Sequence, residues 1–245
     1  MSAFLYGVAL QWRLDIRSRT LLITCYVVPL LFFAVMGGIF SSINPAARDT
    51  LIQSMTVLGV STGALIGLPP SLTEVYGSDI RNVYKANGVP LYLGLVSMFL
   101  SAFIHLLIMC AIIYVAAPIA FSAALPADPP SYFGALAVFI AVSLSIGSIL
   151  GLAIKNQAKL TMISQVIFLP SIMLSGIMFP ADLLPGVFKA VGTLFPAAWG
   201  YRLMSDGGFS FANLWPLAAI FFAAAIICVF LLRGLGAKYG VKRIS

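Results

Sequence analysis

The amino-acid sequence predicts an all-α integral membrane protein with six transmembrane helices and both termini in the cytoplasm. Three observations predict this class: the apolar composition, six long apolar runs and the distribution of the basic residues. Of the 245 residues, 61% are hydrophobic and 9% are charged, whereas typical soluble domains carry about 25% charged residues. Because the runs occupy most of the chain, we expect residues 1–245 to form a single transmembrane domain.

Six apolar runs account for the predicted crossings. A helix that spans the bilayer needs about 20 predominantly apolar residues, and each run approaches or exceeds that length. The longest intervals between them are residues 69–90 on the predicted inner side and 180–210 on the predicted outer side. The six runs are Leu21–Phe40, Leu51–Leu68, Leu91–Ala117, Tyr132–Ile154, Leu160–Phe179 and Phe211–Leu232.

The basic residues set the predicted orientation. With both termini cytoplasmic, all but three of the 14 Lys and Arg residues lie on the inner side, and only Arg48, Lys189 and Arg202 lie outside. Basic residues of short loops concentrate on the cytoplasmic side of membrane proteins. The net charge of +7 therefore indicates orientation and contact with anionic lipid, and we expect no nucleic-acid partner.

An amphipathic segment, residues 1–19, precedes the first run. Its Trp12, Leu14 and Ile16 alternate with charged residues, as in helices that lie in the membrane interface. We expect an interfacial helix on the cytoplasmic face, with Trp12 at the depth of the lipid headgroups. The alternative is a plain polar beginning of the first transmembrane helix.

The sequence argues against ion coupling, ATP binding and metal binding by this chain. All seven acidic residues lie outside the runs, whereas ion-coupled transporters place ionisable groups near the bilayer midplane. The sequence contains no Gly-x4-Gly-Lys-Ser/Thr loop that would bind ATP phosphates, so uphill transport would need energy from a separate subunit. Cys25, Cys110 and Cys228 are far apart within apolar runs, so we expect no metal site.

A separate subunit needs a docking surface on the cytoplasmic side, and the best candidate is the inner segment Leu72–Pro90. Aromatic side chains alternate there with charged ones, a composition that suits a protein partner better than bare lipid. The alternative is an ordinary solvated loop. The residues that we expect to contact the partner are Glu74, Tyr76, Gly77, Asp79, Arg81, Tyr84 and Lys85.

Small residues recur at helical spacing in the second and fourth runs. They let helix backbones approach closely, which is how membrane helices associate without a hydrophobic driving force. We expect packing within the chain, and a seam between two copies is the alternative. Pro29 and Pro170 are expected to kink the first and fifth helices. The small residues are Gly59, Gly63 and Gly67 in the second run, and Ser143, Gly147 and Gly151 in the fourth.

The residues from Gly59 to Gly63 also match G-x-S-x-G, the pattern of a nucleophilic serine, here Ser61. The only histidine, His105, lies in the third run at a similar depth, so a Ser–His intramembrane protease is a rival hypothesis. It is disfavoured because the pattern belongs on a strand-to-helix turn and because helix packing already explains the glycines. We expect His105 to make an interhelical hydrogen bond or to line a substrate path.

The most distinctive segment is Ser175–Leu203, where Pro180, Pro185 and Pro196 forbid one continuous helix. We expect the fifth run to end near Phe179. The chain should then lie along, or dip into, the outer membrane face, where its irregular backbone can find polar partners.

The residues after Pro185 predict an amphipathic helix with one apolar face and with Lys189 free to reach the headgroups. We interpret this segment as a shallow hydrophobic cap at the outer interface, and a disordered external loop is the alternative. The apolar face comprises Val187, Phe188, Val191 and Leu194, and the residues assigned to the cap are Pro180, Pro185, Phe188 and Pro196.

These features together resemble the permeases of ABC-2 type exporters. The resemblance spans nearly the whole chain. Its most specific part is a run that ends in Ser-Gly-apolar-apolar-Phe-Pro, followed by Leu-Pro, an amphipathic turn and a final Pro. In that family the first inner loop holds a coupling helix, commonly Glu-Arg-Glu-x-Gly followed by basic residues. Glu74, Gly77 and Lys85 fit this outline, whereas Val75 and Tyr76 depart from it.

The resemblance implies a transport subunit of the bacterial cytoplasmic membrane that binds no cofactor and performs no covalent chemistry. Two permeases, identical or paralogous, would pair, and two cytoplasmic ATPase subunits with ATP and Mg²⁺ would push on Leu72–Pro90. Runs one and five would line the path, to which we assign Pro29, Pro170 and His105. The uncharged interior suits export of an apolar or amphipathic cargo, such as a drug, an antibiotic, a modified peptide or a lipid-like molecule. Export of a polysaccharide or lipid-linked glycan is the alternative.

Overall fold

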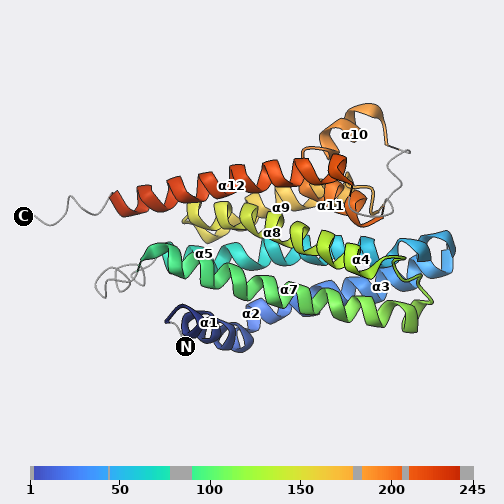
Figure 1. Cartoon of the computed structure of the whole chain (residues 1–245), viewed down its shortest axis with the longest axis horizontal. Helices are drawn as coiled ribbons and strands as arrows, with labels where there is room; N and C mark the ends of the chain where they lie inside the picture. The colour runs from blue at the N-terminus through green and yellow to red at the C-terminus, as the bar shows by residue number, and fades with distance from the viewer. Residues whose placement is uncertain (1–2, 44, 78–89, 179–183, 206–209, 238–245) are drawn as a thin grey trace, which may run out of the picture.

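The computed structural model describes residues 3–43, 45–77, 90–178, 184–205 and 210–237. Within these ranges every regular element is helical, and the longer helices lie roughly along the long axis of the molecule (Figure 1). The predicted all-α class is therefore confirmed. A helix pairs its backbone polar groups within itself, which is what a bilayer demands of a spanning segment.

The α-helices keep the labels of Figure 1, and η denotes π-helical and 3₁₀ turns. In chain order they are α1 (Ala3–Arg17), α2 (Arg19–Leu22), η1 (Ile23–Val27), α3 (Val28–Ile43), η2 (Pro45–Asp49), α4 (Leu51–Thr62), η3 (Gly63–Gly67), α5 (Leu68–Gly77), α7 (Leu91–Phe121), α8 (Pro129–Ala153), α9 (Gln157–Met173), α10 (Gly186–Gly192), α11 (Pro196–Ser205) and α12 (Phe211–Ala237).

Two π-helical turns, η1 and η3, each end two residues before a proline. Pro29 is the second residue of α3, and Pro69 is the second residue of α5. Proline lacks an amide donor and its ring clashes with the carbonyl one turn earlier, and a π turn locally widens the hydrogen-bond ladder at that place. Both helices therefore continue across their prolines. Pro170 lies within α9, close to its end.

The element formed by α4, η3 and α5 occupies the centre of the bundle. It runs without a break over Leu51–Gly77, and its most apolar stretch of 18 residues is 94% buried. The corresponding stretches of the spans that contain α3 and α12 are only 22% buried. The central element packs against α3, η1, α7, α8 and α9. The helix thus extends well beyond the predicted run, which ended at Leu68, and its last turn already belongs to the predicted docking segment.

Within the described residues, five helices are long and apolar enough to cross a membrane. They are Ile23–Ser42, Leu51–Gly77, Leu91–Phe121, Pro129–Ala153 and Phe211–Leu235.

The remaining predicted crossing corresponds to α9, which has 17 residues and ends at Met173, whereas the predicted run continued to Phe179. Gly176 adopts a φ of 92°, a left-handed conformation that glycine tolerates and that a helix cannot include. The described residues directly after Met173 form turns, and a crossing by α9 stays a prediction.

Candidate functional site

Small residues of α4 and η3 lie where this element packs against its neighbours in the same chain. A Cβ atom at Gly59 would lie 2.6 Å from Met109 Cε and 3.3 Å from Pro29 Cβ. Gly63 and Gly67 are enclosed in the same manner by side chains of η1, and Gly63 also by a side chain of α7. The glycine face of this element therefore allows close contact with η1, α3 and α7.

Gly147 and Gly151 bring α8 against the backbone of η3 and α5. A Cβ atom at Gly147 would collide with the carbonyl oxygen of Ala64, and one at Gly151 would lie 2.8 Å from the carbonyl oxygen of Pro69. Ser143, the third small residue of α8, is 1% exposed. Because the groups in contact are backbone atoms held within helices, this contact has little room to adjust.

The last turn of α5, at the predicted inner end of the bundle, is fastened to two other helices. The hydroxyl of Thr73 donates to the carbonyl oxygens of Gly151 at 3.1 Å and of Ile154 at 3.0 Å. The hydroxyl of Tyr76 donates to the carbonyl oxygen of Leu91 at 2.6 Å. The end of α5 is therefore hydrogen bonded to the end of α8 and to the beginning of α7.

The structure separates the predicted docking residues into two kinds. Glu74 and Gly77 are exposed at the end of α5. Tyr76 differs from the expectation, because its side chain is 3% exposed and packs inside the chain, so it presents no surface to a partner. Four further predicted docking residues lie outside the described residues: Asp79, Arg81, Tyr84 and Lys85.

His105 belongs to α7 and contacts residues of α1 and η1. Its Nδ1 lies 2.8 Å from the hydroxyl of Tyr26, with which it is hydrogen bonded. The indole of Trp12 stacks on the imidazole with ring centroids 4.0 Å apart and planes 11° apart. Of the two roles expected for His105, the structure contains the interhelical hydrogen bond. Trp12 thus covers His105 of α7, and its location at the depth of the lipid headgroups stays a prediction.

Asp15 of α1 is buried beside His105. One carboxylate oxygen accepts a hydrogen bond from the hydroxyl of Ser101 on α7, and the other accepts one from Gln11 Nε2 at 2.8 Å. Burial raises the pKa of the Asp15 carboxyl, and the hydrogen bonds from Ser101 and Gln11 oppose that rise only in part. This carboxylate joins α1 to a membrane-spanning helix.

Sequence reasoning missed this contact because it treated Asp15 as one charge among several on a surface helix. A signal was present in the spacing. Trp12 and Asp15 are three residues apart, and Ser101 and His105 are four apart, so each pair lies on one face of its helix.

Ser61 lies within α4, in a helix that continues through Gly77. The G-x-S-x-G pattern therefore stands on a helix and not on a strand-to-helix turn. The described polar partner of His105 is Tyr26, and no hydrogen bond between His105 and Ser61 occurs among the described residues. The geometry does not support a Ser–His pair.

The predicted cap corresponds in part to α10. Val187 and Leu194 are each 74% exposed, Phe188 is 52% exposed and Val191 is 37% exposed, so the described residues leave much of this apolar face uncovered. Pro185 directly precedes α10, and Pro180 lies outside the described residues. The location of α10 at a membrane surface stays a prediction.

Pro196 differs from its assignment to the cap. It is the first residue of α11 and is buried, and α11 packs against α8, α12 and α4. A Cβ atom at Gly200 would collide with the ring of Phe139 on α8. The indole of Trp199 donates to the carbonyl oxygen of Thr193 at 2.7 Å. The second half of the outer segment is therefore part of the bundle.

No group of three or more His, Cys, Asp or Glu side chains that could hold a metal ion occurs among the described residues. Three cysteines are buried and form no disulfide: Cys25, Cys110 and Cys228.

Comparison with known proteins agrees with this arrangement of apolar helices. A family model for ABC-2 type transporters matches residues 3–209, a range that begins with α1 and includes α11. A comparison with curated individual proteins gave no match. Because the family match covers most of the sequence, the chain belongs to the ABC-2 type transporter family, whose members are membrane components of transporters.

Proposed function

We propose that this chain is the permease subunit of an ATP-driven exporter in a bacterial cytoplasmic membrane. Its cargo would be apolar or amphipathic: a drug, an antibiotic, a modified peptide or a lipid-like molecule. Family membership supports the transport role, because ABC-2 permeases generally work with an ABC ATPase. The proposed assembly has two cytoplasmic ATPase subunits, which bind ATP and Mg²⁺, and a second permease that is identical or paralogous.

The connection from the inner docking segment to the core carries the proposal. The central element runs from Leu51 to Gly77, so its inner end lies in the segment proposed to bind the ATPase. Thr73 and Tyr76 fasten this end to α8 and α7. A push on the exposed Glu74 would therefore move three helices together. Such rigid coupling is what a permease needs if ATP hydrolysis in another subunit is to open a path.

The cargo class rests on the apolar face of α9. Met162, Val166, Leu169 and Met173 recur every three or four residues and are 53–65% exposed. The similar apolar face of α3 includes Leu31, which is 62% exposed. Uncharged faces of this kind suit contact with lipid, with a second permease or with an apolar cargo.

Co-purification tests the function and its docking site. We expect an ABC ATPase to be recovered with the tagged wild-type permease and to support ATP-dependent export in vesicles. Glu74→Arg should lower that recovery about tenfold, since reversing one interface charge costs at least the 1.4 kcal/mol that a factor of ten represents.

Asp49→Arg is the matched control, because it makes the same charge change at an exposed carboxylate of η2, near the opposite end of the central element. Equal recovery with both variants would contradict docking at Glu74. An absence of any ATPase from the wild-type preparation, together with no ATP-dependent export, would contradict the function itself.

A further inference from the structure

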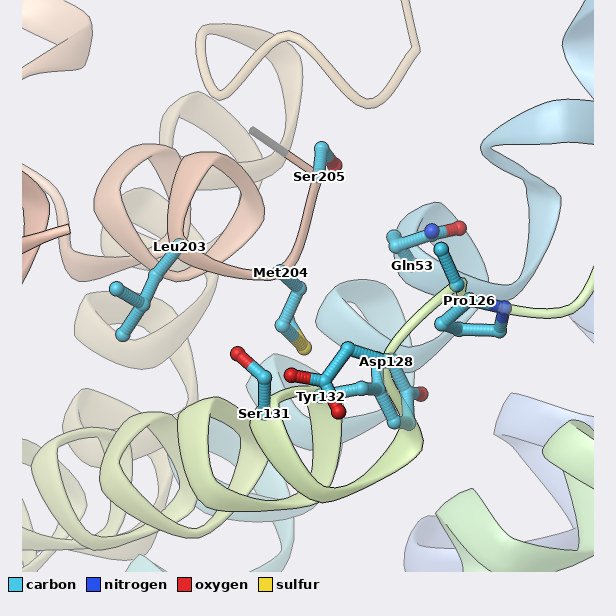
Figure 2. Close-up of a pocket in the computed structure, with 9 residues that line it drawn as sticks. Gln53, Pro126, Asp128, Ser131, Tyr132, Leu203, Met204 and Ser205 are labelled. Carbon is cyan, nitrogen blue, oxygen red and sulfur yellow. The ribbon is translucent and has the colours of Figure 1, made fainter. Parts of the chain in front are cut away.

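A small cavity lies at the end of the bundle where α4 and α8 begin and α11 ends, the outer end in the predicted orientation. Its volume is about 120 Å³, which is room for about four water molecules. Figure 2 shows Gln53 and Pro126 on one side, Leu203 on the opposite side, and Asp128 with Ser131 below. The cavity lies at the opposite end of the central element from the docking segment and shares no residue with the His105 contacts.

Two side-chain oxygens at this cavity have no hydrogen-bond partner among the described residues. Gln53 is 6% exposed and its Oε1 is unpaired, and the hydroxyl of Ser205 is also buried and unpaired. Tyr132, by contrast, uses its hydroxyl in a 2.8 Å hydrogen bond with Thr56. Leaving a buried acceptor without a partner is costly. The cavity is therefore suited to a group that donates hydrogen bonds.

Charge selects the kind of donor. Asp128 lines the cavity and is exposed, and none of the residues lining it is basic. A primary ammonium group has three donors and no acceptor. It can therefore donate to Gln53 Oε1 and to the Ser205 hydroxyl, and the carboxylate of Asp128 attracts its charge. Leu203 and Met204 offer apolar contact to the carbon atoms beside the nitrogen.

We propose that this cavity binds the primary ammonium group of a small amine, supplied either as a free amine or as the headgroup of an aminolipid at the outer membrane surface. A quaternary ammonium group has no N–H donor, so it would leave Gln53 Oε1 unpaired. The site does not depend on the proposed export function, because none of its residues belongs to the docking segment or to the predicted path.

Thermal unfolding of the full-length chain, purified in detergent without aminolipid, tests the proposal with ethanolamine as the probe. Ethanolamine should raise the unfolding midpoint saturably, because a ligand bound only by the folded state stabilises it. Ethylene glycol, which lacks the ammonium group, should not. Asp128→Asn should raise the ethanolamine concentration for half-maximal effect about tenfold, as expected for the loss of one charged partner. Asp49→Asn, which removes an exposed carboxylate outside the cavity, should leave it unchanged.

Gln53→Met provides a second variant that keeps the length of the side chain. It removes a buried acceptor that has no partner, so the unfolding midpoint without amine should not fall, and the response to ethanolamine should disappear. A merely structural role for Gln53 would give the opposite pattern, with a lower midpoint and an unchanged response.

Nanodiscs distinguish the two sources of the ammonium group. A higher midpoint in phosphatidylethanolamine than in phosphatidylcholine, abolished by Asp128→Asn, identifies the lipid headgroup as a ligand. A response to free ethanolamine alone identifies a free amine. The proposal is overturned if ethanolamine and ethylene glycol act equally on the wild-type chain, or if Asp128→Asn behaves like the wild type in both experiments.

Discussion

The contact between α8 and the central element differs in kind from the contact between α1 and α7. At Gly147 and Gly151, α8 touches the backbone of η3 and α5, and even one added carbon would collide. At the other contact, α1 is held by side chains, through the stacking of Trp12 on His105 and the hydrogen bond from Ser101 to Asp15. The first contact has little room to adjust, whereas the second can be weakened by one substitution or by the loss of one proton from Asp15.

This difference follows from where each helix lies. Transmembrane helices have no hydrophobic driving force for association, because lipid is as apolar as a neighbouring helix. They associate through close packing of their backbones. α1 has exposed apolar residues of its own, including Leu10 and Leu14, which are 47% and 54% exposed. An amphipathic helix of this kind stays at a membrane surface without a partner. In the predicted interfacial location, the polar contacts of α1 would therefore decide its position on the bundle and not its association with the membrane.

The largest effect is expected at the glycine contact. Gly147→Leu would force a side chain into the carbonyl oxygen of Ala64, which is held within a helix, and the cost should be about 3 kcal/mol or more. We expect little monodisperse protein in size-exclusion chromatography after extraction. Gly234→Leu is the control, because a Cβ atom there meets nothing within 4 Å. Equal yields of the two variants would show that the contact can adjust after all.

A smaller effect is expected when α1 is released. Asp15→Ala removes the acceptor used by Ser101 and Gln11, which should weaken the attachment of α1 by about 1–3 kcal/mol. The bundle should keep its size-exclusion profile, while α1 should become more susceptible to proteolysis. Arg13→Ala changes an exposed charge on the same helix and should alter neither property. Loss of the whole folded protein in Asp15→Ala would mean that the fold requires α1 as much as it requires α8.

The attachment of α1 should also depend on pH. Burial raises the pKa of Asp15 above its ordinary value of 3.8, so the docked helix holds the proton more tightly than the released helix. Docking is then strongest below 3.8 and weakens as the pH rises through the raised pKa. Acidification from neutral pH should slow hydrogen exchange in α1. Asp15→Asn, which retains His105, should lose this dependence, and a persistent dependence would assign it to another group.

Local patterns made the central packing predictable, and long-range contacts escaped prediction. Hydropathy and small residues every four positions are read within one helix, and they located the central element and its glycines. The hydrogen bond from Ser101 to Asp15 joins residues 86 apart in the sequence, so a pattern within one helix cannot reveal it. The end of α9 was misplaced for another reason: the residues after Met173 are apolar enough for a helix, yet α9 ends at Met173 and the following residues form turns that include the left-handed Gly176.

The smallest effect is expected at Ser61, a buried residue of α4 in the central element. Ser61 is 2% exposed, and alanine preserves the small volume that the neighbouring helices require. Ser61→Ala should therefore change the free energy of unfolding by no more than about 1 kcal/mol and leave transport intact. Ser101→Ala, the matched hydroxyl deletion in the adjustable contact, should instead loosen α1. Labelling of Ser61 by a fluorophosphonate probe, abolished by His105→Ala, would contradict this view, because it would require His105 to leave Tyr26 and act as a base.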